Sequence, residues 1–324
     1  MSVLVYLETA SDGVDEASLQ ALTLARTLAD GAPVAAIVAA DSISAAVPAA
    51  AGLHGADTLH AAEDSVFATH APLAAARAVV AATTTAGVAT IVGPGTETGN
   101  EVLAHAAAIL DAPLAANCLS AATGADGIRV TRVRWGGSLL EEAIAAGPVV
   151  LLTAQAHAVT AAETGGSPAA VSALTIELGD ADRVVRVIDR VEAAAGGISL
   201  ADAKVVVTGG RGVGSAEGFA SVEELAATLG GAVGCSRAVT IAGWRPHTDQ
   251  VGQTGTKVAP DLYIACGVSG ATQHMAGCKG AKKILAVNTD REASIIQNAD
   301  YAVIGDLHEV LPAISAELRR VRGE

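Results

Sequence analysis

Five apolar segments in the second half of the sequence are each followed by residues that suit binding of a phosphorylated ligand. The predicted strands are Lys204 to Thr208, Ala232 to Cys235, Leu262 to Gly267, Lys283 to Val287 and Tyr301 to Ile304. The residues after them include Gly209 to Gly214 with Arg211, then Ser236 and Arg237, Gly267 to Gly270, Asn288, and Asp306. In a parallel sheet these strand ends meet at one edge, where ligands bind. Glycines let backbone N–H groups approach a phosphate, and arginine pairs with its oxygens.

Motifs of the common nucleotide and catalytic sites are absent or incomplete. The glycine cluster after Gly209 is not GxGxxG in register, and residues 252–257 are too compact for the phosphate loop GxxxxGK[ST]. Residues 267–271 resemble the nucleophile elbow of hydrolases but lack its last glycine, although Asp306 and His308 lie downstream as possible triad partners. No histidine belongs to an HxxxH or carboxylate-supported set, so we predict no metal site.

The first half alternates short apolar segments with alanine-rich stretches, which is typical of a mostly parallel sheet with crossover helices. The predicted strands are Val3 to Tyr6, Val34 to Ala40, Ala89 to Val92 and Val149 to Thr153. The predicted helices are Ala17 to Ala29, Pro72 to Ala82 and Asn100 to Leu110. Three further strands are close together in the sequence, which predicts a partly antiparallel edge. They are Ile128 to Arg134, Val171 to Glu177 and Val184 to Val191.

Small, loop-like residues from Ala193 to Ala203 separate the two halves. We place the domain boundary there, which gives an N-terminal α/β domain at 1–192 and a C-terminal domain at 193–324. In the second domain, a capping box at Ser221 to Glu224 predicts the start of a helix. Further helices are expected at Gly270 to Ala276, Glu292 to Ala299 and His308 to Val321. The fold class is α/β with two Rossmann-like domains, of which the C-terminal one has a doubly wound parallel sheet.

Composition and charge limit the class of protein. Of 324 residues, 51% are hydrophobic and 17% are charged, so the chain can bury a core and fold. A net charge of −14 disfavours nucleic acid and anionic lipid as partners. We find no transmembrane segment and no leader peptide, and the four cysteines form no CxxC pair, so we expect a cytoplasmic protein with reduced thiols. The pairs Glu141–Glu142 and Glu223–Glu224 are interpreted as solvated helix faces.

Several ordered motifs in the C-terminal half resemble the alpha subunit of electron transfer flavoproteins. They are Gly209-Gly-Arg-Gly212, Cys235-Ser-Arg237, Val251-Gly-Gln-Thr-Gly255, Ala259-Pro-Asp-Leu-Tyr263, Ser269-Gly-Ala-Thr-Gln-His274, Asn288 and Asp306-Leu307. The resemblance covers about Lys204 to Leu318, whereas the first half matches that family in length, pattern and alanine-rich αβ character. In one departure, Thr256 stands between Gln-Thr-Gly and Lys257, where the family often has lysine directly.

The resemblance implies that the C-terminal domain binds FAD. The residues expected around FAD are Arg211, Ser236, Arg237, Val251, Gly252, Gln253, Thr254, Ser269, Gly270, Ala271, Thr272, Gln273, His274, Asn288, Asp306 and Leu307. By similarity to the family, Thr254 donates its hydroxyl to flavin N5 and Gln253 contacts the ring. The pyrophosphate lies at Ser269 to Gln273, and Asn288 and Asp306 face the adenosine end. His274 and Arg237 suit the negative charge that develops near flavin N1 and O2 on one-electron reduction.

The predicted function is that of a redox carrier, not an enzyme with its own small-molecule substrate. The second domain has only Phe219, Trp244, Tyr263 and Tyr301 as aromatics, too few to enclose the ring on both faces. By resemblance, the N-terminal domain pairs with a beta subunit, which carries AMP or a second flavin. Electrons come from flavin dehydrogenases, such as those that oxidise acyl-CoA thioesters in fatty acid β-oxidation, and leave through an anionic semiquinone to a quinone oxidoreductase. The alternatives are a nucleotide-binding sensor without redox turnover and an NAD-dependent enzyme.

Overall fold

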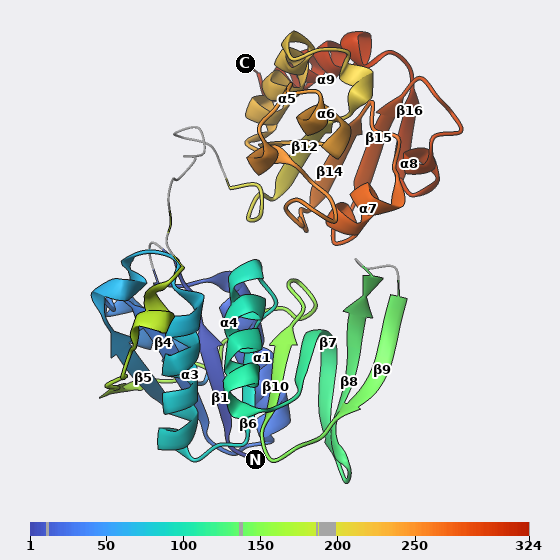
Figure 1. Ribbon diagram of the computed structural model, residues 1–324. Coiled ribbons are helices and arrows are strands. Elements are labelled where there is room, and N and C mark those ends of the chain that lie inside the picture. Colours follow the sequence, from blue (N-terminus) through green and yellow to red (C-terminus); the bar gives the residue numbers. More distant parts are fainter. Residues whose placement is uncertain (11–12, 136–138, 186, 188–198, 324) are drawn as a thin grey trace. The chain divides into compact units, whose positions relative to one another are not determined.

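The computed structural model describes residues 1–10, 13–135, 139–185, 187 and 199–323, which form two compact units (Figure 1). Described residues up to 187 belong to the first unit, and those from 199 belong to the second. The predicted boundary at 193 lies outside the described residues. So does much of the strand predicted at 184–191, and its described residues 184, 185 and 187 are not in a strand.

A nine-stranded sheet forms the centre of the first unit, in the order β11-β5-β4-β1-β6-β10-β7-β8-β9. Its strands are β1 (Val3–Leu7), β4 (Val34–Ala40), β5 (Thr58–Glu63), β6 (Thr90–Pro94), β7 (Leu114–Gly124), β8 (Gly127–Arg134), β9 (Leu139–Ala145), β10 (Val150–Ala154) and β11 (Ala170–Ala173). The strands from β11 to β7 are parallel, whereas β8 and β9 are antiparallel to their neighbours. The predicted antiparallel edge is confirmed for β8. The prediction for residues 171–177 was wrong, because β11 pairs in parallel with β5 at the opposite edge.

Helices cover both faces of this sheet because its central strands are apolar on both sides. They are α1 (Glu16–Ala29), α2 (Ala46–Leu53), α3 (Pro72–Ala86) and α4 (Glu97–Leu110), and the short pair β2 (Thr9–Ala10) and β3 (Gly13–Val14) follows β1. Along β1, Val3, Val5 and Leu7 pack into one core and Leu4 and Tyr6 into the other. This alternation follows from the two-residue period of a strand and makes a three-layer sandwich.

The second unit contains a five-stranded, fully parallel sheet in the order β13-β12-β14-β15-β16. Its strands are β12 (Val205–Gly209), β13 (Ala232–Cys235), β14 (Leu262–Cys266), β15 (Ile284–Asn288) and β16 (Tyr301–Ile304). All five lie at the predicted segments, because each is a β-branched or small apolar run bounded by glycine or polar residues.

Five helices pack on the two faces of this sheet among the described residues. They are α5 (Ala220–Leu229), α6 (Arg237–Ile241), α7 (Thr272–Cys278), α8 (Ser294–Gln297) and α9 (Leu307–Arg322). Helices α5, α6 and α9 contribute to one buried cluster, and α7 and α8 to the other, so the sheet is doubly wound as predicted. The predicted capping box was wrong: α5 begins at Ala220, and the Ser221 hydroxyl donates to the Gly218 carbonyl.

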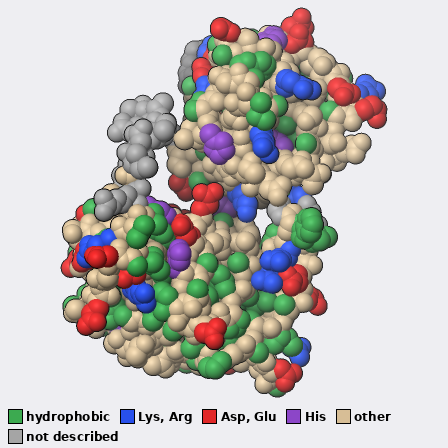
Figure 2. Space-filling model, in the orientation of Figure 1, with side chains coloured by type: hydrophobic (Ala, Val, Ile, Leu, Met, Phe, Trp, Pro, Cys, Tyr) green, Lys and Arg blue, Asp and Glu red, His purple; other side chains and the backbone are tan. Residues whose placement is uncertain are grey.

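Charged side chains are scattered on the surface shown in Figure 2, and the described residues on that face make no continuous basic patch. None of the helices in the described ranges combines the length and apolar composition needed to cross a membrane. All four cysteines, Cys118, Cys235, Cys266 and Cys278, are buried and unpaired.

Candidate functional site

The candidate site lies at the carboxyl edge of the C-terminal sheet. The chain passes from β12 to β13 on one side and then to β14 on the other, so the strand order reverses between β12 and β14. Such a reversal opens the crevice where ligands bind in sheets of this kind. Because all five strands are parallel, the predicted strand-end residues are gathered at this edge, as the sequence suggested.

The glycines after β12 have a packing role that differs from the expected one. The Gly210 N–H donates to the Cys266 carbonyl at 2.8 Å, and the Gly212 N–H donates to the Gly267 carbonyl at 3.0 Å. A Cβ atom at Gly210 would lie 2.2 Å from the Gly267 oxygen. These glycines therefore let two adjacent turns touch, and the two N–H groups are used within the protein. Arg211 lies between them and is exposed.

The turn after β14 has the free donors that the first turn lacks. Within the described chain, no backbone N–H from Val268 to Gln273 donates to another protein group. Gly270 approaches α8 so closely that a Cβ there would lie 2.2 Å from the Ile295 nitrogen. A row of unpaired N–H groups at a glycine turn suits the oxygens of a pyrophosphate.

Two segments predicted separately from the sequence contact each other directly. The Gln253 N–H donates to the Gln273 carbonyl at 2.7 Å. A Cβ at Gly277 would lie 2.3 Å from the Gly252 nitrogen, and Gly252 itself has φ of +152°, which favours glycine. Residues 251–254 are therefore packed along α7, from Gln273 in its first turn to Gly277 near its end, beside Ser269 to His274.

Thr254 belongs to a chain of polar side chains that the sequence did not reveal. Gln250 is 2% exposed, and its Nε2 donates to the Thr254 hydroxyl oxygen at 3.0 Å. The Thr240 hydroxyl donates to Gln250 Oε1 at 2.7 Å. In the sequence, the only signal for Gln250 is a long polar side chain directly before the Val251-Gly-Gln-Thr motif.

His274 is buried, with 7% of its surface exposed, and its Nε2 lies 2.8 Å from the Tyr263 hydroxyl. Burial lowers the pKa of His274 to about 4, an effect that the Val251 carbonyl partly opposes. Nδ1 is buried too and has no well-formed hydrogen bond to any described residue. At neutral pH His274 is therefore uncharged in the free chain, where it can act as a hydrogen-bond donor.

The remaining predicted residues make contacts within the protein. Asn288 Nδ2 donates to the Val268 carbonyl at 2.9 Å, and Asn288 Oδ1 accepts from the Asp290 N–H at 3.0 Å. Asp306 caps α9 by accepting from the His308 N–H at 2.9 Å. Leu307 is buried in the core. The structure brings these residues to the same edge, where they shape the turns.

Two arginines at this edge are unpaired. Arg211 and Arg237 are both exposed, and neither has an ion-pair or hydrogen-bond partner for its guanidinium among the residues that the structure describes. Ser236 directly precedes Arg237, and its N–H donates to the Gly209 carbonyl at 3.0 Å, which ties this turn to the end of β12. Unpaired arginines beside free N–H groups make this edge attractive to an anion.

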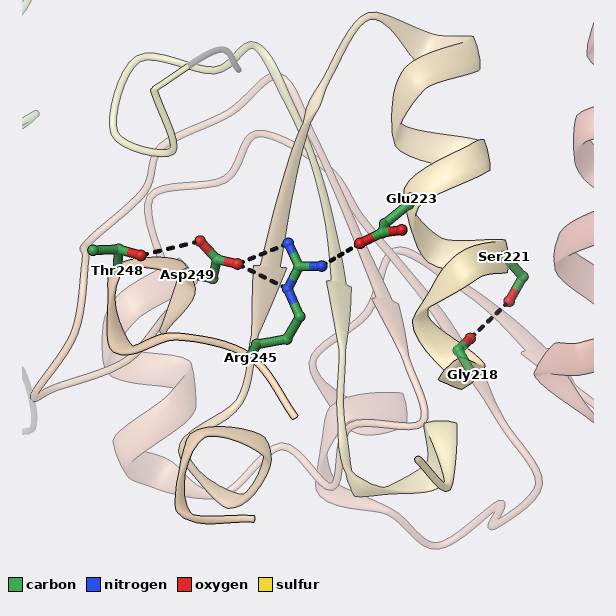
Figure 3. A network of polar contacts seen from close by, with 6 residues as sticks. All are labelled: Gly218, Ser221, Glu223, Arg245, Thr248 and Asp249. Atoms are coloured by element: carbon green, nitrogen blue, oxygen red, sulfur yellow. Dashed lines mark hydrogen bonds and ion pairs between the residues drawn. The ribbon is translucent and has the colours of Figure 1, made fainter. Parts of the chain in front are cut away.

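A half-buried arginine holds the loop that leads to Gln250 (Figure 3). Arg245 pairs with Asp249 at 2.8 Å and with Glu223 on α5, and its guanidinium lies 5.5 Å from the centre of the Phe219 ring. Glu223 lies exposed on α5, as predicted for a solvated helix face, and it also makes this ion pair. Glu224 likewise pairs with Arg319. Glu141 lies on a strand, not on a helix, and pairs with Arg132.

FAD, the cofactor implied by the resemblance, fits these residues. The free N–H groups from Val268 to Gln273 suit its pyrophosphate, and Arg211 and Arg237 supply positive charge. The buried Nδ1 of His274, which lacks a partner among the described residues, and the exposed hydroxyl group of Thr254 are polar groups of the kind that a flavin ring contacts.

Comparisons with known proteins agree with this site. Residues 3–179 match the electron transfer flavoprotein domain, and residues 199–279 match the electron transfer flavoprotein FAD-binding domain. The electron transfer flavoprotein subunit alpha of Mycobacterium leprae is 35% identical, with 99% of each chain covered. The Paracoccus denitrificans subunit alpha is 36% identical, covering 98% of this chain and 100% of that one. The Bacillus subtilis subunit alpha is 37% identical over 70% of this chain and 69% of its own length.

One domain match lies in each unit, and the match to residues 199–279 identifies FAD as the cofactor. The chain therefore belongs to the alpha-subunit family of the electron transfer flavoproteins.

Proposed function

We propose that the chain is the FAD-binding half of a heterodimeric electron carrier. It pairs with a beta subunit, accepts electrons from flavin dehydrogenases such as acyl-CoA dehydrogenases, and passes them to a quinone oxidoreductase through an anionic semiquinone. The observation that carries the proposal is the edge of the C-terminal sheet, where Thr254, His274 and Arg237 present a hydroxyl, a buried imidazole and an unpaired guanidinium.

The roles assigned to these residues follow from their chemistry. Bound FAD supplies one-electron redox chemistry. A neutral His274 has one ring proton, and if Tyr263 donates to Nε2, that proton is on Nδ1 and can be donated to the flavin N1 and O2 region. Arg237 adds positive charge where electrons would accumulate, and Thr254 donates toward flavin N5. Ser269 to Gln273 hold the pyrophosphate, with Asn288 and Asp306 toward the adenosine end.

The N-terminal domain provides the surface for the beta subunit in this proposal. The edge strand β9 exposes Leu139, Leu140 and Ile144, which are 56%, 66% and 51% exposed. Exposed apolar side chains on an unpaired strand are typical of a covered interface. We place the assembled carrier in the cytoplasm, because its four cysteines are buried free thiols.

The test is stepwise anaerobic reduction of the chain coexpressed with its beta subunit, followed by visible absorption. We expect a yellow protein that passes through a red anionic semiquinone. In Arg237→Ala the maximum yield of that radical should fall while the stability of the fold is unchanged, because Arg237 is exposed and unpaired in the described chain. Replacing His274 with an apolar residue should lower the potential for the first electron. A well-folded heterodimer without flavin, or an unchanged radical yield in Arg237→Ala, would contradict the proposal.

A further inference from the structure

We propose that Gln250 is a positioning residue that sets the direction of the Thr254 hydroxyl proton. This inference rests on the proposed contact between Thr254 and flavin N5. A threonine hydroxyl has one proton and can donate only one strong hydrogen bond, so any group that takes this proton removes it from the flavin. Gln250 contacts the Thr254 oxygen from the protein side and therefore controls which way the proton points.

The amide orientation of Gln250 carries the argument. Its Nε2 lies 3.0 Å from Thr254 Oγ1, and an amide nitrogen can only donate, so Thr254 must accept this hydrogen bond. The Thr254 proton is thereby directed away from Gln250. Thr254 itself is exposed, so the proton faces the open side of the loop.

Thr240 favours that orientation. Its hydroxyl has one proton and two acceptors within reach, Gln250 Oε1 at 2.7 Å and the Arg237 carbonyl at 2.9 Å, and the shorter contact is the one to Gln250. If the amide were reversed, Oε1 would face Thr254 and take its proton. The Thr240 donor stabilises the orientation in which Oε1 is already satisfied. Thr240 belongs to α6, whose first residue is Arg237.

The surroundings keep this chain of hydrogen bonds in place. Gln250 is almost fully buried, and its N–H and carbonyl groups bond to the His247 carbonyl at 3.0 Å and the Thr256 N–H at 2.7 Å. The ion pair between Arg245 and Asp249 anchors the preceding residue (Figure 3). Buried, fully bonded amides have few alternative rotamers, so a polar side chain here can orient its neighbour.

Two substitutions of Gln250 separate a positioning role from a packing role. In Gln250→Glu, the protonated carboxyl group has one donor and one acceptor and imitates the amide, whereas the ionised carboxylate has acceptors only and takes the Thr254 proton. Gln250→Met fills similar space without either property and leaves the Thr254 proton free for the flavin. A residue that only packs would respond alike to both substitutions.

The experiment uses the heterodimer reconstituted with FAD labelled with ¹⁵N at N5, and the readout is the ¹⁵N chemical shift of N5. Thr254→Val defines the value without the hydrogen bond. In Gln250→Glu we expect the shift to move with rising pH from the wild-type value to the Thr254→Val value, whereas wild type and Gln250→Met do not titrate. Thr240→Val should move the shift toward the Thr254→Val value, and Thr240→Ser should restore it.

Each result decides between the explanations. A pH-independent N5 shift in Gln250→Glu at the wild-type value would overturn the proposal, and equal shifts in Gln250→Glu and Gln250→Met across the whole pH range, including the highest pH, would assign Gln250 a packing role instead. If Thr254→Val leaves the ¹⁵N chemical shift of N5 unchanged while FAD is bound, the proposed contact between Thr254 and N5 is wrong. The positioning role of Gln250, which rests on that contact, is then wrong too.

Discussion

The buried histidine predicts a pH dependence of the stability of the C-terminal unit. Burial lowers the pKa of His274 to about 4, from its ordinary value of 6.5. The unfolded chain therefore binds a proton at higher pH than the folded chain, and stability is lost as the pH falls from about 6.5 to about 4. Because one pKa unit corresponds to about 1.4 kcal/mol, acidification from about pH 7 to about pH 5 should lower the free energy of unfolding by roughly 2 kcal/mol.

The neighbours of His274 do not titrate in this window. Burial raises the pKa of Tyr263 well above its ordinary value and raises that of the Cys278 thiol to about 11, so both stay neutral. Tyr263 donates to or accepts from Nε2 throughout, and protonation of His274 would place a charge in a buried site. Within this cluster, the loss of stability on acidification is therefore caused by protonation of His274 alone.

The assay is urea unfolding of the FAD-free chain, followed by tryptophan fluorescence. Trp244 is partly buried in the C-terminal unit, whereas Trp135 is 79% exposed and changes little on unfolding. The control is His274→Gln, which has no group that titrates between about pH 4 and pH 7. We expect the wild type to lose roughly 2 kcal/mol more than the control between about pH 7 and pH 5. Equal losses in the two chains would refute the buried, neutral state of His274.

Two further substitutions test the packing around the site. Gly210→Ala should destabilise the C-terminal unit by about 1 to 3 kcal/mol and weaken FAD binding, measured by urea unfolding and fluorescence titration. Its Cβ would lie 2.2 Å from a Gly267 backbone atom, whereas at the control Gly305→Ala the nearest atom is a side-chain methyl at 3.3 Å. Arg245→Met should accelerate FAD release and lower the free energy of unfolding by about 1 to 3 kcal/mol, because it leaves two acidic partners unpaired. The control Arg320→Met removes an exposed ion pair and should change neither the rate of FAD release nor the free energy of unfolding. Similar losses of stability in both arginine variants would contradict a special role of Arg245.

The strand positions of the C-terminal unit were predictable because they depend on local patterns, whereas β5, β7 and β9 of the first unit were not predicted. The segment at Leu262–Cys266, for example, is apolar and bounded by polar and glycine residues, and its burial on both faces follows from that composition. The place of β11 was not predictable, because pairing with β5 depends on a partner more than a hundred residues away. Local periodicity describes a strand but does not identify its neighbour.

The site was predictable in its outline but not in its side-chain contacts. The motifs at Val251 to Thr254 and Ser269 to His274 identified segments that the structure brings together through Gln253 and Gln273. The role of Gln250 was missed because its partners, Thr240 on α6 and Thr254 in the following loop, meet it only when the loop folds back on the helix. The exposed helix position of Glu223 was predicted, but its partner was not, since Arg245 reaches it from another loop. Hydrogen-bond partners of this kind depend on tertiary packing.

The absence of a dinucleotide fingerprint has a physical explanation in this fold. A GxGxxG turn binds pyrophosphate because the N–H groups after the first strand are free. Here Gly210 and Gly212 donate theirs to the turn after β14, so the first turn cannot hold the phosphates in that way. The free donors lie from Val268 to Gln273 instead. The N–H groups of the turn after β12 therefore stabilise the turn after β14. The N–H groups of the turn after β14 stay free to bind phosphate oxygens. In the proposed site, a pyrophosphate at the second turn would lie next to the loop of Thr254, where a flavin joined to it would need its ring contacts.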